Sequence, residues 1–340
     1  MKKKSRKSML KPILLILLLI VAAAVVLVGI HVWETKQSEA AVAAQLAEAE
    51  EDATEGLTYF EDAWYALRED LELVLVLGID DFEEDISEEI YRNTQQSDFL
   101  MLLILDEENE SFSVLHLNRD IMTEITVLGV TGQKAGTTTA QLALAHTYGS
   151  GAEDSCRNTV EAVEDLLYGV EIDHYVSLTM DAVAILNDLV GGVTVTVLDD
   201  LTSADEELVE GATVTLEGEQ ALTYVRTRYG LEDSTNLTRM KRQQQYLEAL
   251  LEQARAAMAE DADFSASALL ELSSYIVSDC SATKLSELSG QVAEYEYLAV
   301  YEIEGEATVG DEYMEYYVDE TALQELVIEL FYEEVEVDEE

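Results

Sequence analysis

The residues best suited to chemistry in this sequence are basic side chains gathered between Arg226 and Arg242. This stretch holds five of the chain's 19 Lys and Arg, and a further six lie in residues 2–11. Outside residues 2–11, only 13 basic side chains therefore stand against 71 Asp and Glu. Such a local concentration of positive charge in a strongly acidic chain indicates a site that holds an anion.

The spacing of these arginines suits a phosphate group. Arg226 and Arg228 are two residues apart in a segment that we expect to be extended, so their side chains leave the same face. Asn236 is a favourable N-cap for a long helix, near whose positive end Arg239 and Arg242 share one face. Guanidinium groups beside a helix N-terminus can bind phosphate or pyrophosphate through charge-assisted hydrogen bonds. The alternative is a solvated basic face paired with neighbouring acids.

Carboxylates are expected beside the ends of apolar strands. Residues 71–79 form a nearly continuous apolar run that ends at Asp80, Asp98 precedes a second such run, and Arg119 and Asp120 follow a third. Ligands of open α/β sheets bind at strand ends, and two carboxylates there can hold Mg²⁺ that bridges phosphate oxygens. The alternative, in a chain with 71 acidic residues, is that these aspartates cap turns.

Helical and strand patterns alternate along the rest of the chain. Residues 181–189 form an amphipathic helical pattern, which Gly191 and Gly192 end before the strand pattern of 193–198. Helices interleaved with buried strands predict an α/β sandwich. We expect it to occupy residues 71–332, with a solvated acidic tail at 333–340.

The N-terminus predicts a membrane anchor. Residues 1–11 are basic, and residues 13–30 are an unbroken run of 18 apolar or glycine residues. At about 1.5 Å per residue, this run and its flanks can cross a bilayer core. A cleaved signal peptide is the alternative, but the run is long for one. We therefore expect a signal anchor at 12–33 in the cell membrane, with the N-terminus inside, and a helical stalk at 34–70 that carries an extracytoplasmic domain.

Other kinds of site find little support. The four His are scattered, no HExxH or GxSxG motif is present, and so acidic a chain repels nucleic acid. Cys156 and Cys280 have no CxxC spacing. A disulfide between them is permitted outside the cytoplasm, but the sequence does not show one.

Seven short segments, taken in order, resemble the LytR-CpsA-Psr family. They are Leu75–Asp80 (LVLGID), Ser97–Asp98, Asn118–Asp120, Val190–Val193 (VGGV), Leu216–Ala221 (LEGEQA), Arg226–Arg228 and Arg239–Gln244 (RMKRQQ). The resemblance implies an α/β fold in which a central mixed β-sheet lies between helical layers, with a long apolar pocket for a polyprenyl chain. It also implies an enzyme that moves a glycopolymer from an undecaprenyl-pyrophosphate carrier onto peptidoglycan, through a phosphodiester link and with Mg²⁺ or Mn²⁺.

The resemblance further implies roles for individual residues. Asp80 and Asp98 match the metal-binding aspartates of the family, and Asp120 would orient an arginine or assist the acceptor hydroxyl. The side chains expected to contact the pyrophosphate are Arg119, Arg226, Arg228, Arg239, Arg242 and Gln243.

The sequence departs from the family pattern at two positions. Gln96 stands where the family often has an arginine, and Arg92 could take that place. Asn236 stands where the family often has an aspartate. Because an asparagine cannot act as a general base, that role passes to Asp233 or another carboxylate.

Two alternative functions remain open at this point. The same residues could hydrolyse the lipid pyrophosphate, with water as the acceptor. The chain could also be a non-catalytic module that binds cell-wall lipids.

Overall fold

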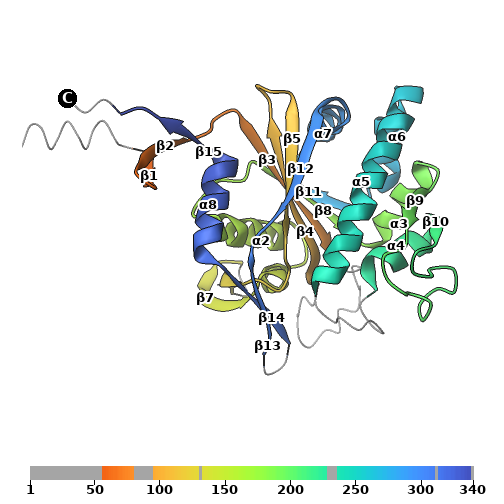
Figure 1. Ribbon diagram of the computed structural model, residues 1–340, viewed down its shortest axis with the longest axis horizontal. Coiled ribbons are helices and arrows are strands. Elements are labelled where there is room, and N and C mark those ends of the chain that lie inside the picture. Colours follow the sequence, from red (N-terminus) through yellow and green to blue (C-terminus); the bar gives the residue numbers. More distant parts are fainter. Residues whose placement is uncertain (1–55, 80–94, 130–131, 228–235, 311–312, 338–340) are drawn as a thin grey trace, which may run out of the picture. The chain divides into compact units, whose positions relative to one another are not determined.

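The computed structural model describes residues 56–79, 95–129, 132–227, 236–310 and 313–337 (Figure 1). The chain divides into two compact units. One comprises Met1–Leu67 with Glu333–Glu340, and the other comprises Arg68–Tyr332.

A six-stranded sheet forms the centre of the larger unit. Its order is β11-β8-β3-β4-β5-β12, with β8–β3 and β5–β12 parallel and the other neighbours antiparallel. The predicted mixed sheet is therefore confirmed. The three predicted apolar strands are β3, β4 and β5, which are almost entirely buried, as expected for strands covered on both faces. The strands are β3 (Leu71–Ile79), β4 (Ser97–Asp106), β5 (Ser111–Leu117), β8 (His174–Thr179), β11 (Ile276–Ser278) and β12 (Glu296–Glu302).

Helices cover both faces of this sheet. Alternate side chains of the central strands point to opposite faces, so Leu75 belongs to one apolar core and Val74 to another. The first core includes α2 (Glu153–Leu166), the 3-10 helix η2 (Leu142–Tyr148) and α8 (Glu320–Phe331). The second includes α5 (Asn236–Glu260) and α7 (Ala282–Glu294). Figure 1 shows α2 and α8 on one side of the sheet and α5 on the other, which confirms the predicted helical layers.

Two helices of these layers, α7 and α8, begin at capping side chains. The side chain of Asp319 accepts hydrogen bonds from the backbone N–H groups of Thr321 and Ala322 at the start of α8. The Ser281 hydroxyl accepts one from the Lys284 N–H at the start of α7. Each cap satisfies N–H groups that have no partner within the helix, which stabilises the helix by about 1 kcal/mol.

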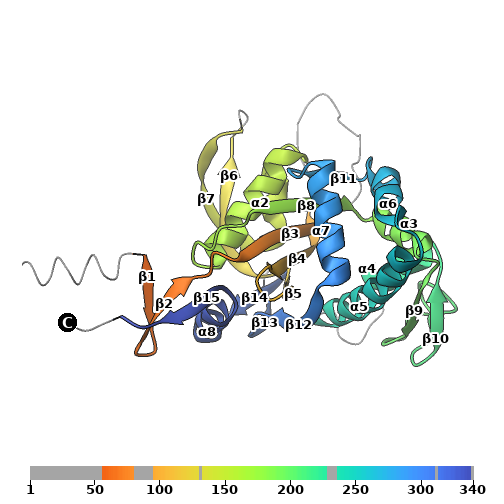
Figure 2. The ribbon, with the colours of Figure 1, turned by 90° about the horizontal axis from the view of Figure 1, so that it is seen from above.

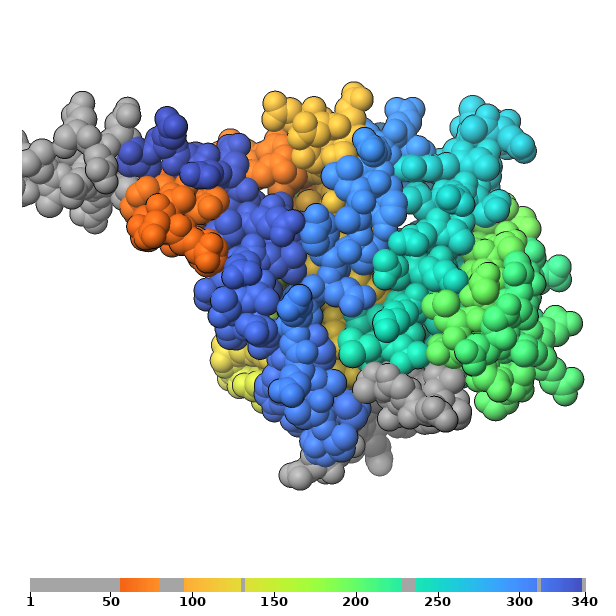
Figure 3. Space-filling model, in the orientation of Figure 1, coloured from red at the N-terminus to blue at the C-terminus, as the bar shows by residue number. Residues whose placement is uncertain are grey.

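A third core joins α5 to a group of smaller elements. This group includes α3, which has the predicted limits, α4, and the hairpin of β9 and β10. Figure 2 shows a second hairpin, β6–β7, beside α2. In Figure 3, which has the orientation of Figure 1, the C-terminal elements cover most of the central strands. The remaining elements are α3 (Asp181–Leu189), α4 (Glu219–Arg226), α6 (Phe264–Leu272), β6 (Met122–Leu128), β7 (Lys134–Gln141), β9 (Val193–Thr196), β10 (Thr213–Leu216), β13 (Gly305–Val309) and β14 (Met314–Val318).

The smaller unit contains a three-stranded sheet of β1 (Leu57–Phe60), β2 (Ala63–Leu67) and β15 (Tyr332–Val335). The predicted helical stalk is therefore wrong over residues 57–67, because this aromatic-rich segment forms a hairpin. Glu61 and Asp62 connect the two strands and have φ values of 44° and 67°. A two-residue type I′ turn requires positive φ at both positions. Residues 333–335 of the predicted solvated tail form the end of β15, in which Glu333 and Glu334 are exposed as expected.

The membrane anchor remains a prediction. Among the described residues, no helix is both long and apolar enough to cross a membrane. The basic tail at 1–11, the anchor at 12–33 and the stalk up to residue 55 lie outside the described residues.

Two glycines allow the packing to be tested. A Cβ on Gly149, where η2 ends, would lie 2.5 Å from the backbone nitrogen of Ser155, whereas a Cβ on Gly290 within α7 would meet no atom within 4 Å. Gly149→Ala should therefore destabilise the chain by about 1–3 kcal/mol. Gly290→Ala should stabilise it by about 0.5–1 kcal/mol, because glycine is unfavourable inside a helix. Thermal unfolding of both variants measures the difference, and equal melting temperatures would contradict this packing.

Candidate active site

The ends of two central strands and the start of a third lie at one edge of the sheet. β3 and β5 end where β4 begins, because both run antiparallel to it. Ile79 pairs with Ser97, the residue before Asp98, while Arg119 follows β5. The antiparallel pairing therefore places Asp98 and Arg119 at the same edge. Asp80 follows Ile79 in the sequence and lies outside the described residues.

Arg119 is the centre of a buried polar network. Its Nη1 forms an ion pair with Oδ1 of Asp98, and its Nη2 donates a hydrogen bond of 2.5 Å to Oε1 of Gln96. Its Nε lies 3.4 Å from Oδ1 of Asp120. Arg119 is 5% exposed and Asp98 is 7% exposed, so the carboxylates compensate a charge that has been withdrawn from water. Gln96, at the position where the family often has arginine, here orients Arg119.

A second arginine reaches the same place from the helical layer. Nη2 of Arg239, near the start of α5, donates a hydrogen bond of 2.9 Å to the backbone oxygen of Asp98. Arg239 is 2% exposed. The structure thus brings together Arg119 and Arg239, predicted for the anion site, and Asp98, predicted as a metal ligand.

Asp120 is held in place by its neighbours. Its Oδ1 accepts a hydrogen bond of 2.8 Å from Nε2 of Gln141, and its backbone oxygen accepts one of 2.9 Å from the Tyr316 N–H. Its own N–H donates to Oδ1 of Asn118 at 3.0 Å. With its carboxylate fixed between Gln141 and Arg119, Asp120 is placed to orient the arginine, one of the two roles expected for it.

Asn236 lies beside this network at the first turn of α5. Its Nδ2 donates a hydrogen bond of 2.9 Å to Oδ1 of Asn118. Its own Oδ1 is buried and accepts no hydrogen bond from the described residues. An amide oxygen can accept a hydrogen bond from a hydroxyl but cannot take up its proton. Asp233, the base that we expected instead, lies outside the described residues.

Arg242 does not have the position predicted for a pyrophosphate ligand. It is fully buried, and its three nitrogens all donate to protein groups. Nε donates to the backbone oxygen of Tyr224 at 2.9 Å, Nη1 to Oδ2 of Asp199 at 2.5 Å, and Nη2 to the backbone oxygen of Thr227. Arg242 therefore attaches the end of α4 to α5.

The arginine pair that precedes α5 also differs from expectation. Arg226 is the last residue of α4 and is exposed, so the extended segment expected there is wrong at this position. Arg228 lies outside the described residues, as does Arg92.

Gln243 lies in α5, next to the buried His116. Its Nε2 donates a hydrogen bond of 3.3 Å to the backbone oxygen of Val225. Burial and the positive charge of Arg239 lower the pKa of His116, and a hydrogen bond with Gln243 opposes this effect only in part. The resulting pKa is about 4. His116 is thus neutral at pH 7 and adds no positive charge to that of the buried arginine.

An apolar cavity of about 150 Å³ lies one residue along β4 from Asp98. Phe99, the residue after Asp98, lines it, and Gln243 is one of its few polar lining residues. It lies between the sheet and helices α3 and α5, and its apolar walls suit a hydrocarbon better than water. Further lining residues are Val76, Met101, Leu178, Val183, Leu247 and Leu250.

Sequence reasoning did not identify Gln141 and Tyr316 as contributors to the site. Gln141 ends β7, and its Nε2 also donates to the Met314 backbone oxygen at 2.7 Å. Neither residue lies in a recognisable motif. Only the folded arrangement of β5, β7 and β14 brings them to Asp120.

The fold and the site together define an α/β sandwich protein with a buried arginine–carboxylate network beside an apolar cavity. The chain belongs to the LytR_cpsA_psr family, whose model matches residues 32–331. The resemblance found in the sequence is therefore confirmed.

Two curated relatives are each 30% identical to the chain. One is the polyisoprenyl-teichoic acid–peptidoglycan teichoic acid transferase TagU of Halalkalibacterium halodurans, aligned over 181 residues, which are 53% of this chain and 52% of the relative. The other is biofilm regulatory protein A of Streptococcus mutans, aligned over 186 residues, 52% of this chain and 43% of the relative. The chain thus spans about half the length of the curated relatives it matches.

Solved structures share the fold. Protein gbs0355 from Streptococcus agalactiae has a TM-score of 0.63 and 22% identity, covering 76% of this chain and 86% of that one. A structure described as TagT bound to LI-WTA has a TM-score of 0.58 and 22% identity, covering 77% of this chain and 90% of that one.

The role assigned to Arg242 can be tested by its removal. Arg242→Gln should lower the free energy of unfolding by about 3–5 kcal/mol, because it leaves Asp199 and the backbone oxygens of Tyr224 and Thr227 without their partner. The matched control is Lys241→Gln, one residue earlier on α5 and exposed, which should change stability by less than about 0.5 kcal/mol. Denaturant unfolding of the full chain measures both. If the Arg242→Gln variant were as stable as wild type, Arg242 would again be a candidate for binding the pyrophosphate.

The buried histidine makes a prediction about pH. Since the pKa of His116 is lowered to about 4 in the folded chain, the unfolded chain binds the additional proton between about pH 6.5 and pH 4. The contribution of His116 to stability should therefore decrease as the pH falls through this window, and His116→Asn should remove that dependence. An NMR titration of the imidazole is the direct measurement, and a midpoint near pH 6.5 would contradict the buried, neutral state.

Proposed function

We propose that this chain is a phosphotransferase that moves a glycopolymer from an undecaprenyl-pyrophosphate carrier onto peptidoglycan through a phosphodiester link. Its family membership and the transferase named among its relatives support this proposal. The single observation that carries it is the buried network of Asp98, Arg119 and Arg239 beside an apolar cavity. A polyprenyl pyrophosphate is an amphiphile with both an anionic and a hydrocarbon part.

In the proposed reaction, a hydroxyl oxygen of peptidoglycan attacks the phosphorus that carries the glycan. The bond from this phosphorus to the bridging oxygen breaks, and the polyprenyl phosphate leaves with the electron pair. Arg119 and Arg239 would stabilise the negative charge that develops on the leaving group, which is the step where fixed positive charge contributes most. Asp120 would keep Arg119 oriented, and the proton of the acceptor hydroxyl would pass to a carboxylate, for which Asp233 remains the candidate.

The carboxylates at the sheet edge suit a hard divalent cation. Carboxylate oxygens are ligands that Mg²⁺ prefers, and Asp98 supplies them at the start of β4. The register of β3 with β4 sets Ile79, the residue before Asp80, opposite the residue before Asp98. We propose that Asp80 and Asp98 hold Mg²⁺ or Mn²⁺, which when bound would neutralise phosphate charge.

The predicted anchor at 12–33 fits this function. A single-pass segment with its N-terminus inside would hold the catalytic domain outside the membrane that contains the lipid carrier. The acceptor, peptidoglycan, would lie on the same side. The strongly acidic composition gives no support to nucleic acid as a partner.

The proposal is tested by transfer in vitro. The full chain, with Mg²⁺ present, is mixed with a lipid-pyrophosphate-linked glycan and peptidoglycan oligomers, and products are identified by mass. Arg119→Ala should reduce the rate of transfer by about 100- to 1000-fold, because it removes a fixed stabilising charge. Arg157→Ala is the matched control: this arginine is exposed on α2 and paired with Glu153, so its loss should not affect transfer.

The products also separate the alternatives. A released glycan phosphate without a peptidoglycan adduct would identify a hydrolase of the same carrier. Binding of the lipid without either product would identify a non-catalytic module. Either result contradicts the proposed transfer.

A further inference from the structure

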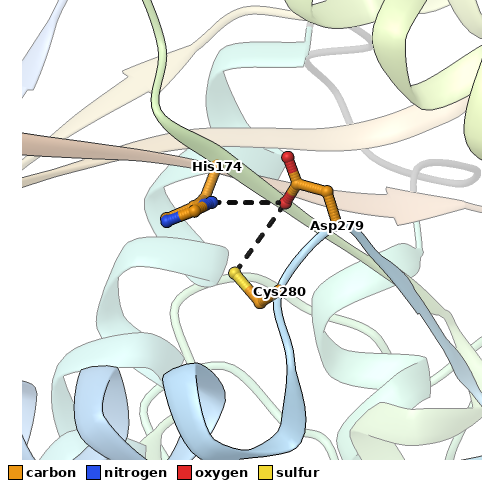
Figure 4. Close-up of side chains that lie close together, drawn as sticks. All are labelled: His174, Asp279 and Cys280. Carbon is orange, nitrogen blue, oxygen red and sulfur yellow. Dashed lines mark hydrogen bonds and ion pairs between the residues drawn. The ribbon is translucent and has the colours of Figure 1, made fainter.

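A second cluster of reactive side chains lies at the opposite end of the central strands from the candidate active site. His174 is the first residue of β8, whereas the candidate active site adjoins the strand ends near Ile79 and Thr179. Asp279 and Cys280 lie between β11 and α7 and approach His174 (Figure 4). One potential ligand atom from each of the three lies within 4.8 Å of the other two.

We propose that His174, Asp279 and Cys280 form a binding site for one divalent transition-metal ion, of which Zn²⁺ is the best match. Nδ1 of His174 lies 3.5 Å from Oδ1 of Asp279, and Sγ of Cys280 lies 3.8 Å from the same oxygen. Ligand atoms about 2.0–2.3 Å from a tetrahedral zinc ion are about 3.3–3.8 Å apart. Two of the three distances between ligand atoms are thus close to those of a zinc site. A small rotation of the half-buried Cys280 side chain would bring the third distance, between His174 and Cys280, into the same range.

The three ligand types determine which metal is favoured. Imidazole and thiolate suit zinc and its neighbours in the transition series, whereas Mg²⁺ and Ca²⁺ require oxygen ligands. The site therefore differs in chemistry from the magnesium site proposed at Asp98. It is also accessible, because the Asp279 side chain is 37% exposed, which leaves the fourth position to water.

Backbone and hydroxyl groups hold two of the ligands in place. Oδ1 of Asp279 accepts a hydrogen bond of 3.1 Å from the Tyr175 N–H. The Cys280 N–H donates to the Ser278 hydroxyl at 3.0 Å, and this hydroxyl donates to the Tyr175 backbone oxygen at 2.6 Å. The segment that carries Asp279 and Cys280 is therefore fixed to β8, the strand that carries His174.

A carboxylate behind the histidine completes the arrangement. Nε2 of His174 lies 3.7 Å from Oε1 of the buried Glu72, which is 2.6 Å from Nζ of Lys284. Zinc-binding histidines commonly direct their second nitrogen to a carboxylate, which favours the tautomer whose other nitrogen faces the metal. Here Nδ1 would be that nitrogen, and it is buried and makes no hydrogen bond among the described residues.

The charges are balanced when a divalent ion is present. Lys284 compensates Glu72, which leaves the Asp279 carboxylate and, after deprotonation, the Cys280 thiolate. Binding as a thiolate would release the thiol proton of Cys280 to solvent. The alternative is a metal-free ion-pair cluster, in which His174 lies between Glu72 and Asp279.

Cobalt spectroscopy of the full chain separates the two. After treatment with EDTA and dialysis, wild type titrated with Co²⁺ should bind one ion and develop the near-ultraviolet absorption of a thiolate–Co²⁺ bond. Cys280→Ser should lose this absorption. Cys156→Ser is the matched control and should keep it, because Cys156 is fully buried in a different core. No absorption in wild type, or equal absorption in Cys280→Ser, would overturn the proposal.

A second measurement needs no variant. Iodoacetamide alkylates the free thiol of Cys280 in wild type, and the modified peptide is followed by mass spectrometry. Equimolar Zn²⁺ should slow this alkylation at least tenfold, and EDTA should restore it, whereas millimolar Mg²⁺ should have no effect. A rate that Zn²⁺ leaves unchanged, or that Mg²⁺ lowers equally, would show that the cluster is an ion pair only.

Discussion

The ion pair of Arg119 with Asp98 is the interaction on which the rest of the site depends. A buried guanidinium is costly unless a carboxylate compensates it, so the two residues must meet in the folded chain. The antiparallel pairing of β4 with β5 brings them together, and Arg239 then binds the Asp98 backbone oxygen from α5. Sheet and helical layer are therefore joined at one residue, and a shift of either would disturb the site.

The overall charge gives a physical reason for burying the proposed anion site. With a net charge of −52 at pH 7, the surface of the chain repels phosphate, so attraction must come from donors held close to the ligand. The apolar cavity at Phe99 would hold the hydrocarbon part of the proposed substrate. Arg242 and Asp120 contribute differently: one attaches α4 to α5, and the other orients Arg119.

Much of this arrangement could be predicted from local sequence. Long apolar runs identified the three central strands, and the glycines after α3 marked its end. Local patterns could not show which arginines are available to a ligand. Arg239 and Arg242 are three residues apart on the same helix and were predicted to share one face, yet all three nitrogens of Arg242 donate to protein groups. Contacts made at long range, such as that of Gln141 with Asp120, have no local signal at all. The hairpin at 57–67 was missed because an acidic, Ala-rich composition hid its aromatic residues.

The central claim is that Arg119 and Arg239 bind a diphosphate attached to a hydrocarbon. Calorimetric titration of the full chain with a short-chain prenyl pyrophosphate tests it most directly, because no acceptor or catalysis is needed. The account predicts that Arg119→Gln and Arg239→Gln each weaken binding by about 10- to 100-fold, the loss expected for a charged hydrogen bond, while the exposed Lys241→Gln leaves it unchanged. Equal affinity in all four proteins would contradict the account.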